Sequence, residues 1–120
     1  MGMRIALATA TPEVRARKYL RMVGAETAFD AVACAEMVAH GKPAPDVYLL
    51  AAQKLELPPR VLLGVEDSPS GVQSAHAAGM TVAMVPDQDQ PSAEIAALCA
   101  LVAPSLAGIA PFVRESLRRP

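Results

Sequence analysis

The sequence has no tryptophan, and aromatic residues make up only 3% of its 120 residues. Apolar residues nevertheless make up 52%, a share that excludes a disordered chain. The core must therefore be built from small and aliphatic side chains and from methionine. The methionines expected to fill it are Met22, Met37, Met80 and Met84. With so few aromatic rings to stack on bases and a net charge of −1, no nucleic-acid partner is expected.

Cysteine and long apolar runs are also scarce. Cys34 and Cys99 lie far apart and form no Cys-x-x-Cys pair, so we expect two reduced thiols in a cytoplasmic protein. The longest apolar run, residues 95–103, is too short to span a bilayer, and no membrane partner is expected. A chain of 120 residues predicts one domain over residues 1–120.

Short apolar runs alternate with helical patterns along the chain. Strands are expected at residues 5–8, 31–34, 61–65, 80–85 and 101–103. Helices are expected at 12–23, 45–55, 69–78, 93–99 and 112–119. Uniformly apolar strands are typical of parallel sheets covered on both faces. The alternation predicts an α/β fold, a mostly parallel sheet with helices on both sides.

Polar residues mark the ends of these elements. Thr11 and Ser68 each precede a proline, a pattern typical of a helix N-cap followed by the first helical residue. Gly24 and Gly79 follow two of the helices, where glycine commonly ends a helix.

Ligands of such folds lie beyond the carboxyl ends of the strands. Thr9 follows the first strand directly, and its hydroxyl together with the amide groups of the next helix would form an anion site. The alternative is that Thr9 and Thr11 only cap that helix. We favour the anion site for Thr9 and the capping role for Thr11.

Lys42 precedes a helix in a loop stiffened by Pro43 and Pro45. An ammonium held in place can neutralise the charge of a transferring phosphoryl group. The alternative is an ordinary surface lysine, and the spacing from the other motifs favours the binding role.

Glu66 and Asp67 end the apolar strand expected at residues 61–65. Two adjacent carboxylates repel each other unless a cation or a donor lies between them, and magnesium suits such oxygen ligands. The alternative is that Asp67 and Ser68 cap the following helix, but capping does not explain Glu66.

In this order, segments 4–11, 41–46, 64–72 and 77–80 resemble the haloacid dehalogenase-like (HAD) phosphotransferase superfamily. The Glu66-Asp67-Ser68 form is similar to its β-phosphoglucomutase and sugar-phosphatase branch. The resemblance implies a three-layer, Rossmann-like HAD core and a magnesium-dependent phosphatase or phosphomutase. Its partner would be a phosphorylated small molecule, expected to be a sugar phosphate.

The resemblance also implies roles for single residues. Thr9, Ala10 and Lys42 would bind the phosphoryl group, and Lys42 would be the catalytic cation that pairs with the nucleophile. Asp67 and Glu66 would hold Mg²⁺.

The first motif of that superfamily, Asp-x-Asp at the end of the central strand, is absent from these 120 residues, as is a cap domain. Asp30 precedes a strand, and Asp87 and Asp89 lie in a loop. We interpret the sequence as the C-terminal half of a HAD core that lacks its first central strand. We expect it to be inactive alone and to bind Mg²⁺ weakly. A shortened chain, a misplaced gene start and a split enzyme all remain open.

Two alternatives remain beside phosphoryl transfer. One is a non-catalytic module of the same fold that binds phosphate or a protein partner. The other, less favoured, is a receiver-type fold, which would place acidic residues where Thr9 stands. Without the central strand, two strand edges face a gap. We expect them to pair directly, to be covered in a homo-oligomer, or to bind the missing N-terminal half.

Overall fold

Parallel strands form two separate sheets in the computed structural model, which describes residues 4–87 and 90–108. The first sheet pairs β1 (Ala6–Thr9) with β2 (Ala31–Cys34). In the second sheet, β4 lies between β3 and β5. These strands are β3 (Leu63–Glu66), β4 (Thr81–Met84) and β5 (Leu101–Val102). The expected α/β class with parallel strands is confirmed.

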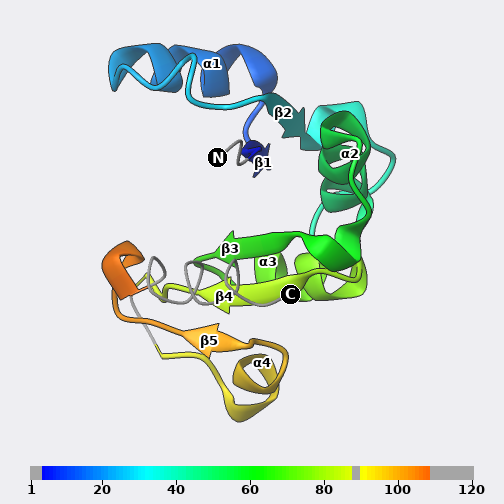
Figure 1. The fold of residues 1–120 in the computed structure, drawn as a ribbon, viewed down its shortest axis with the longest axis vertical. Coiled ribbons are helices and arrows are strands. Elements are labelled where there is room, and N and C mark those ends of the chain that lie inside the picture. The colour runs from blue at the N-terminus through cyan, green and yellow to red at the C-terminus, as the bar shows by residue number, and fades with distance from the viewer. Residues whose placement is uncertain (1–3, 88–89, 109–120) are drawn as a thin grey trace.

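Helices connect the strands and join the two sheets. Their bounds are α1 (Glu13–Met22), α2 (Asp46–Leu55), α3 (Pro69–Ala77) and α4 (Ala93–Ala97). α2 packs on β1 and β2, α3 packs on β3 and β4, and the two helices contact each other (Figure 1). This pair of helices therefore holds the two sheets together. Among the described helices, none has the length and apolar character needed to cross a membrane.

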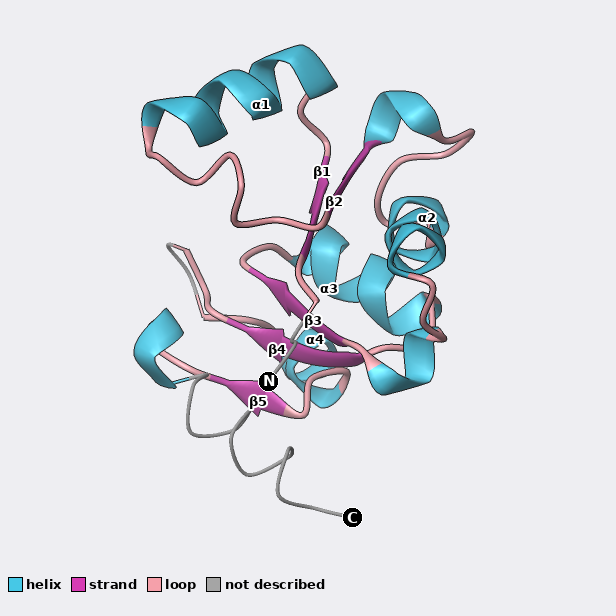
Figure 2. Ribbon diagram, turned by 45° about the horizontal axis from the view of Figure 1, so that its top comes forward, coloured by secondary structure: helices cyan, strands magenta, loops and turns pink. Residues whose placement is uncertain are grey.

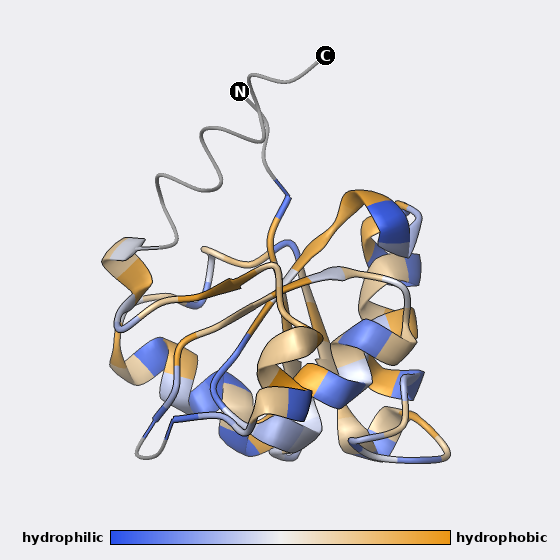
Figure 3. Cartoon of the chain, turned by 90° about the horizontal axis from the view of Figure 1, so that it is seen from below, coloured by the Kyte–Doolittle hydropathy of each residue, from blue (hydrophilic) through white to orange (hydrophobic). Residues whose placement is uncertain are grey.

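The main core lies between these helices and the strands. Its fully buried side chains come from both sheets and both helices: Ala33, Val47, Val72, Ala75, Val82 and Met84. Figure 3 shows the same distribution, with hydrophobic strands inside and hydrophilic segments on the outer sides of the helices. Met80 is also buried, as expected, but Met22 is 71% exposed. That expectation was wrong because Ala16 is the only buried residue of α1 in the described structure.

Local signals predicted most of the boundaries. β2 covers the expected residues, and the Ser68 side chain accepts a hydrogen bond from the Gly71 amide at the start of α3. Thr11 does not cap α1, because Pro12 takes the N-cap position, where no side-chain cap forms. β3 begins at Leu63 because residues 59–61 form a 3-10 turn. The helix expected at residues 112–119 lies outside the described part of the chain.

β1 and β3 belong to different sheets, and Figure 2 shows the β1–β2 sheet above the sheet of β3, β4 and β5. Direct pairing of these strands, one of the expected repairs, does not occur in the described residues. α2 and α3 join the two sheets, and no described strand pairs with the second edge of β1 or of β3. Ile5 and Val65 beside these edges are 44% and 40% exposed.

Candidate functional site

A groove of about 580 Å³ opens at the carboxyl ends of β1 and β3. It receives side chains from both sheets and from the loop before α2. Its walls are Leu7, Ala8, Thr9, Ala10, Lys42, Val65, Glu66, Asp67, Val85, Pro86, Asp87 and Leu106. The structure thus brings together all five residues proposed from the sequence, at the edge where the topology rule expects ligands.

Lys42 bridges the two sides of this groove. Its Nζ lies 2.6 Å from Glu66 Oε2 at the end of β3 and 3.3 Å from the Ala8 carbonyl oxygen in β1. The ammonium also lies 5.3 Å from the centre of the Tyr48 ring, within the range of a cation–π interaction. Because its side chain is only 16% exposed, the charge is held in one place at the junction of the two sheets.

The loop that carries Lys42 is held by two hydrogen bonds, one within the loop and one from α3. The Ala44 amide donates to the Gly41 carbonyl at 3.0 Å, which closes a turn around Lys42. Ser74 of α3 is fully buried, and its hydroxyl donates to the Ala44 carbonyl at 2.6 Å. Sequence reasoning missed Ser74, although a serine on the buried face of a helix usually has a hydrogen-bond partner.

Glu66 is a buried carboxylate, 8% exposed. Its Oε2 accepts hydrogen bonds from Lys42 Nζ and from the Tyr48 hydroxyl. The carboxylate also lies against the backbone of Gly71, where a Cβ would approach Oε1 to 1.9 Å. A buried charge needs such partners, and Lys42 and Tyr48 provide them.

Tyr48 was also missed by the sequence reasoning. It lies on the buried face of α2 with Ala51, Ala52 and Leu55, so a helical pattern centred on this face would have included it. Burial raises the pKa of the Tyr48 hydroxyl above its ordinary value, and the neighbouring Glu66 carboxylate raises this pKa further. The hydroxyl therefore keeps its proton and remains a donor to Glu66.

Thr9 and α1 provide less of an anion site than expected. Thr9 Oγ1 accepts a hydrogen bond from the Thr11 amide at 3.0 Å, and its own hydroxyl proton remains available as a donor. The Glu13 amide in the first turn of α1 already donates to Glu36 Oε1 at 2.6 Å. Of the groups expected to bind an anion, those of Thr9, Ala10 and Lys42 line the groove.

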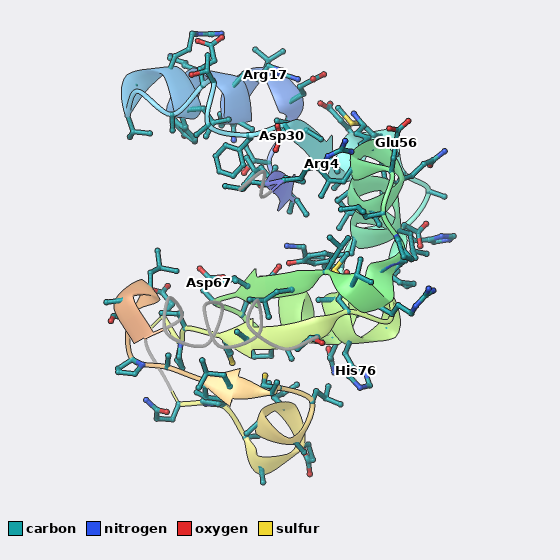
Figure 4. All side chains as sticks on the ribbon, in the orientation of Figure 1. Arg4, Arg17, Asp30, Glu56, Asp67 and His76 are labelled. Atoms are coloured by element: carbon teal, nitrogen blue, oxygen red, sulfur yellow. The ribbon has the colours of Figure 1, made fainter. Side chains whose placement is uncertain are left out.

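Asp67 follows β3 and is exposed at the groove, on the side of β3 that faces β1 (Figure 4). Ser68 caps α3, so the capping alternative does not hold for Asp67. Asp87, which the sequence reasoning set aside as a loop residue, also lines the groove. In the part of the chain that the structure describes, there is no group of three or more Asp, Glu, His or Cys side chains placed so that they could hold a metal ion.

The profile of the haloacid dehalogenase-like hydrolases matches residues 1–79, the range that contains Thr9, Lys42, Glu66 and Asp67. The chain belongs to this family. The receiver-type alternative is thereby excluded. The chain is 41% identical over 90 residues to Protein CbbY of Rhodobacter capsulatus, covering 72% of this chain and 40% of that protein. It is 40% identical over 77 residues to the phosphorylated carbohydrates phosphatase of Thermotoga maritima, covering 64% of this chain and 36% of that protein.

Solved structures show the same fold. The crystal structure of CbbY from Rhodobacter sphaeroides in complex with phosphate superposes with a TM-score of 0.79 at 32% identity. The superposition covers 88% of this chain and 48% of the CbbY chain. The chain therefore spans about two fifths of the curated relatives it matches and about half of this structure.

Proposed function

We propose that this chain is the lysine- and metal-binding half of a magnesium-dependent HAD phosphatase or phosphomutase. The observation that carries the proposal is the position of Lys42, whose Nζ joins the carboxyl ends of β1 and β3 at 3.3 and 2.6 Å. A phosphoryl group in the groove would lie beside this cation. Phosphoryl transfer depends chiefly on positioning and on stabilisation of the negative charge that develops in the transition state.

The phosphoryl group would be bound by the Thr9 hydroxyl, the Ala10 backbone and the Lys42 ammonium, all of which line the groove. The hydroxyl and the amide would fix its orientation, and Lys42 would act as the catalytic cation. The buried surroundings of Lys42 support this role, because a charge acts more strongly on a ligand where water is partly excluded.

Glu66 and Asp67 fit a magnesium site. Both line the groove, and their oxygens are the hard ligands that Mg²⁺ prefers. Magnesium is usually held by one or two carboxylates, waters and substrate phosphate, so two protein ligands are compatible with the ion. When bound, Mg²⁺ would neutralise phosphoryl charge.

The proposed substrate is a phosphorylated sugar. The relatives support this class: one is named a phosphorylated carbohydrates phosphatase, and the CbbY structure holds phosphate. The non-catalytic alternative has less support, because that phosphatase is an enzyme by name.

A nucleophile must come from another segment, because β1 ends at Thr9 and no strand of the described residues ends in Asp-x-Asp. We propose that the missing half of the HAD core fills the gap between β1 and β3 and brings its aspartate toward Lys42. This partner is supported by the second edge of each strand, which pairs with no other strand among residues 4–87 and 90–108. The cytoplasmic setting stays a prediction from the two distant thiols.

Hydrolysis of p-nitrophenyl phosphate tests the proposal. The 120-residue chain alone should show no turnover above background with Mg²⁺, and the same chain extended upstream in its gene should be active. In the extended protein, Lys42→Ala and Asp67→Asn should each lower the rate by about 10²–10³-fold, and Lys18→Ala on the exposed side of α1 should not. Turnover by the 120 residues alone that Asp67→Ala abolishes would contradict the missing nucleophile.

A further inference from the structure

One oxygen of Glu66 takes both of its side-chain donors. Lys42 Nζ and the Tyr48 hydroxyl donate to Oε2, and no side chain in the described residues donates to Oε1. Because no buried polar side-chain atom of the described residues lacks a partner, Oε1 is not fully buried. Glu66 lines the groove, and its Oε1 lies beside the Gly71 backbone without a side-chain donor from the described residues.

The surroundings leave this carboxylate little freedom to rotate. Gly71 lies on one side, where an added Cβ would be 1.9 Å from Oε1 and 2.6 Å from Oε2. Tyr48 is 6% exposed and holds Oε2 from the core side. Lys42 holds the same oxygen from the loop before α2. The contacts with Lys42 and Tyr48 therefore select Oε2 as the accepting oxygen, whereas a carboxylate free to rotate would accept through either oxygen.

We propose that Tyr48 is a positioning residue, whose hydroxyl fixes the Glu66 carboxylate so that Oε2 stays paired with Lys42 and Oε1 is left for a ligand in the groove. The proposal rests on the proposed function, since the groups it positions are the cation and a metal ligand of that site. A phenylalanine at residue 48 would fill the same space in the core but would leave the carboxylate with Lys42 alone.

A merely structural role for the Tyr48 hydroxyl would change stability and nothing else. A positioning role also changes the environment of Lys42, because Glu66 would then move between orientations and release the ammonium for part of the time. The reactivity of the Lys42 amine toward acetic anhydride reports this difference. Lys18, which is exposed on α1, provides the reference rate within the same molecule.

The test compares Tyr48→Phe with Tyr19→Phe, which removes the hydroxyl of the other tyrosine, 54% exposed. In the folded 120-residue chain, Tyr48→Phe should make acetylation of Lys42 several-fold faster, measured by mass spectrometry, with Lys18 unchanged. Tyr19→Phe should alter neither rate. An unchanged Lys42 rate in a folded Tyr48→Phe chain would overturn the proposal.

A second measurement does not require the Tyr48→Phe chain to fold. The chain has no tryptophan and two tyrosines, so tyrosine emission from the Tyr19→Phe chain comes from Tyr48 alone. A carboxylate that accepts the tyrosine hydrogen bond quenches this emission. Adding Glu66→Gln should therefore raise it, and identical emission from the two chains would refute the contact.

Magnesium separates this inference from the proposed function. If Mg²⁺ binds, titration calorimetry should show several-fold weaker binding to Tyr48→Phe than to Tyr19→Phe, and equal binding would argue against positioning. If Mg²⁺ does not bind the unaltered chain, the metal assignment of the proposed function fails. The acetylation and emission results then decide the role of Tyr48 by themselves.

Discussion

The carboxylate of Glu66 lies so close to the backbone of Gly71 that a single methyl group would not fit between them. A Cβ at residue 71 would be 1.9 Å from Oε1 and 2.1 Å from Cδ. The absence of a side chain at Gly71, in the first turns of α3, therefore permits Glu66 to reach Lys42 and Tyr48. A glycine in a helix thus determines the position of a site residue.

Gly71→Ala should displace the Glu66 carboxylate from both of its donors. A buried group left without its hydrogen bonds costs about 1–3 kcal/mol, so the free energy of unfolding in urea should fall by that amount. Gly41→Ala is the control, because a Cβ there meets nothing within 4 Å. Equal unfolding midpoints for the two variants would mean that Glu66 moves aside without cost.

Ser74→Ala should loosen the loop that carries Lys42. The variant leaves the Ala44 carbonyl without the hydrogen bond that the fully buried Ser74 hydroxyl provides at 2.6 Å. The expected loss of stability is about 1–3 kcal/mol, and hydrogen exchange of the Ala44 amide should speed up. Ser105→Ala, at an exposed position, should change neither quantity. Unchanged exchange at Ala44 in the first variant would contradict the anchoring role.

Magnesium should bind the 120-residue chain with a dissociation constant of about 1 mM or weaker, because two carboxylates are few ligands when substrate phosphate is absent. Titration calorimetry should show the heat of binding lost in Asp67→Asn and kept in Asp30→Asn, whose carboxylate instead accepts from the Ile5 amide. Chelation should reverse any change in melting temperature. Micromolar affinity would require ligands beyond Glu66 and Asp67.

β1 and β3 each have one edge that pairs with no strand of the described residues. These edges should make the chain self-associate at micromolar concentration, since unpaired apolar edges promote association. Sedimentation velocity should show a species larger than the monomer that grows with concentration. Val65→Lys places a charge on the β3 edge and should shift the distribution toward the monomer. Val61→Lys, at a 59% exposed position outside β3, should not. A monomer at all concentrations would contradict the predicted homo-oligomer.

Stability should fall at alkaline pH in part through Cys34. Burial raises the pKa of its thiol above the ordinary value of 9.0, and the Glu13 and Glu36 carboxylates add to the shift. As the pH rises, the Cys34 thiol ionises in the unfolded chain at a lower pH than in the folded chain. The contribution of the thiol to stability is therefore complete below its ordinary pKa and is lost as the pH rises through the pKa of the folded state. Urea unfolding at about pH 8 and about pH 10 should show a smaller loss for Cys34→Ala than for the unaltered chain. Equal losses would contradict this role.

The sequence by itself determined the order of the described elements and pointed to five of the residues that line the groove, Thr9, Ala10, Lys42, Glu66 and Asp67. β2, the start of α2 at Asp46 and the Ser68 cap follow from signals that involve neighbouring residues only. The ends of parallel strands meet at one edge, so Thr9 and Asp67 could be placed together without coordinates. Such signals can be read from one sequence because they depend on local backbone geometry and on hydrophobic periodicity.

Only the tertiary structure decided which partners these groups have. The Tyr48 hydroxyl meets Glu66 across 18 residues and the Ser74 hydroxyl meets the Ala44 carbonyl across 30 residues, because α2 and α3 pack against each other. β1 and β3 do not pair in the described residues, although pairing was one of the repairs expected from the sequence. Met22 is exposed for a related reason, since burial depends on what covers a helix and not on the residue alone. Contacts of this kind are set by the relative positions of whole elements, which local sequence patterns do not specify.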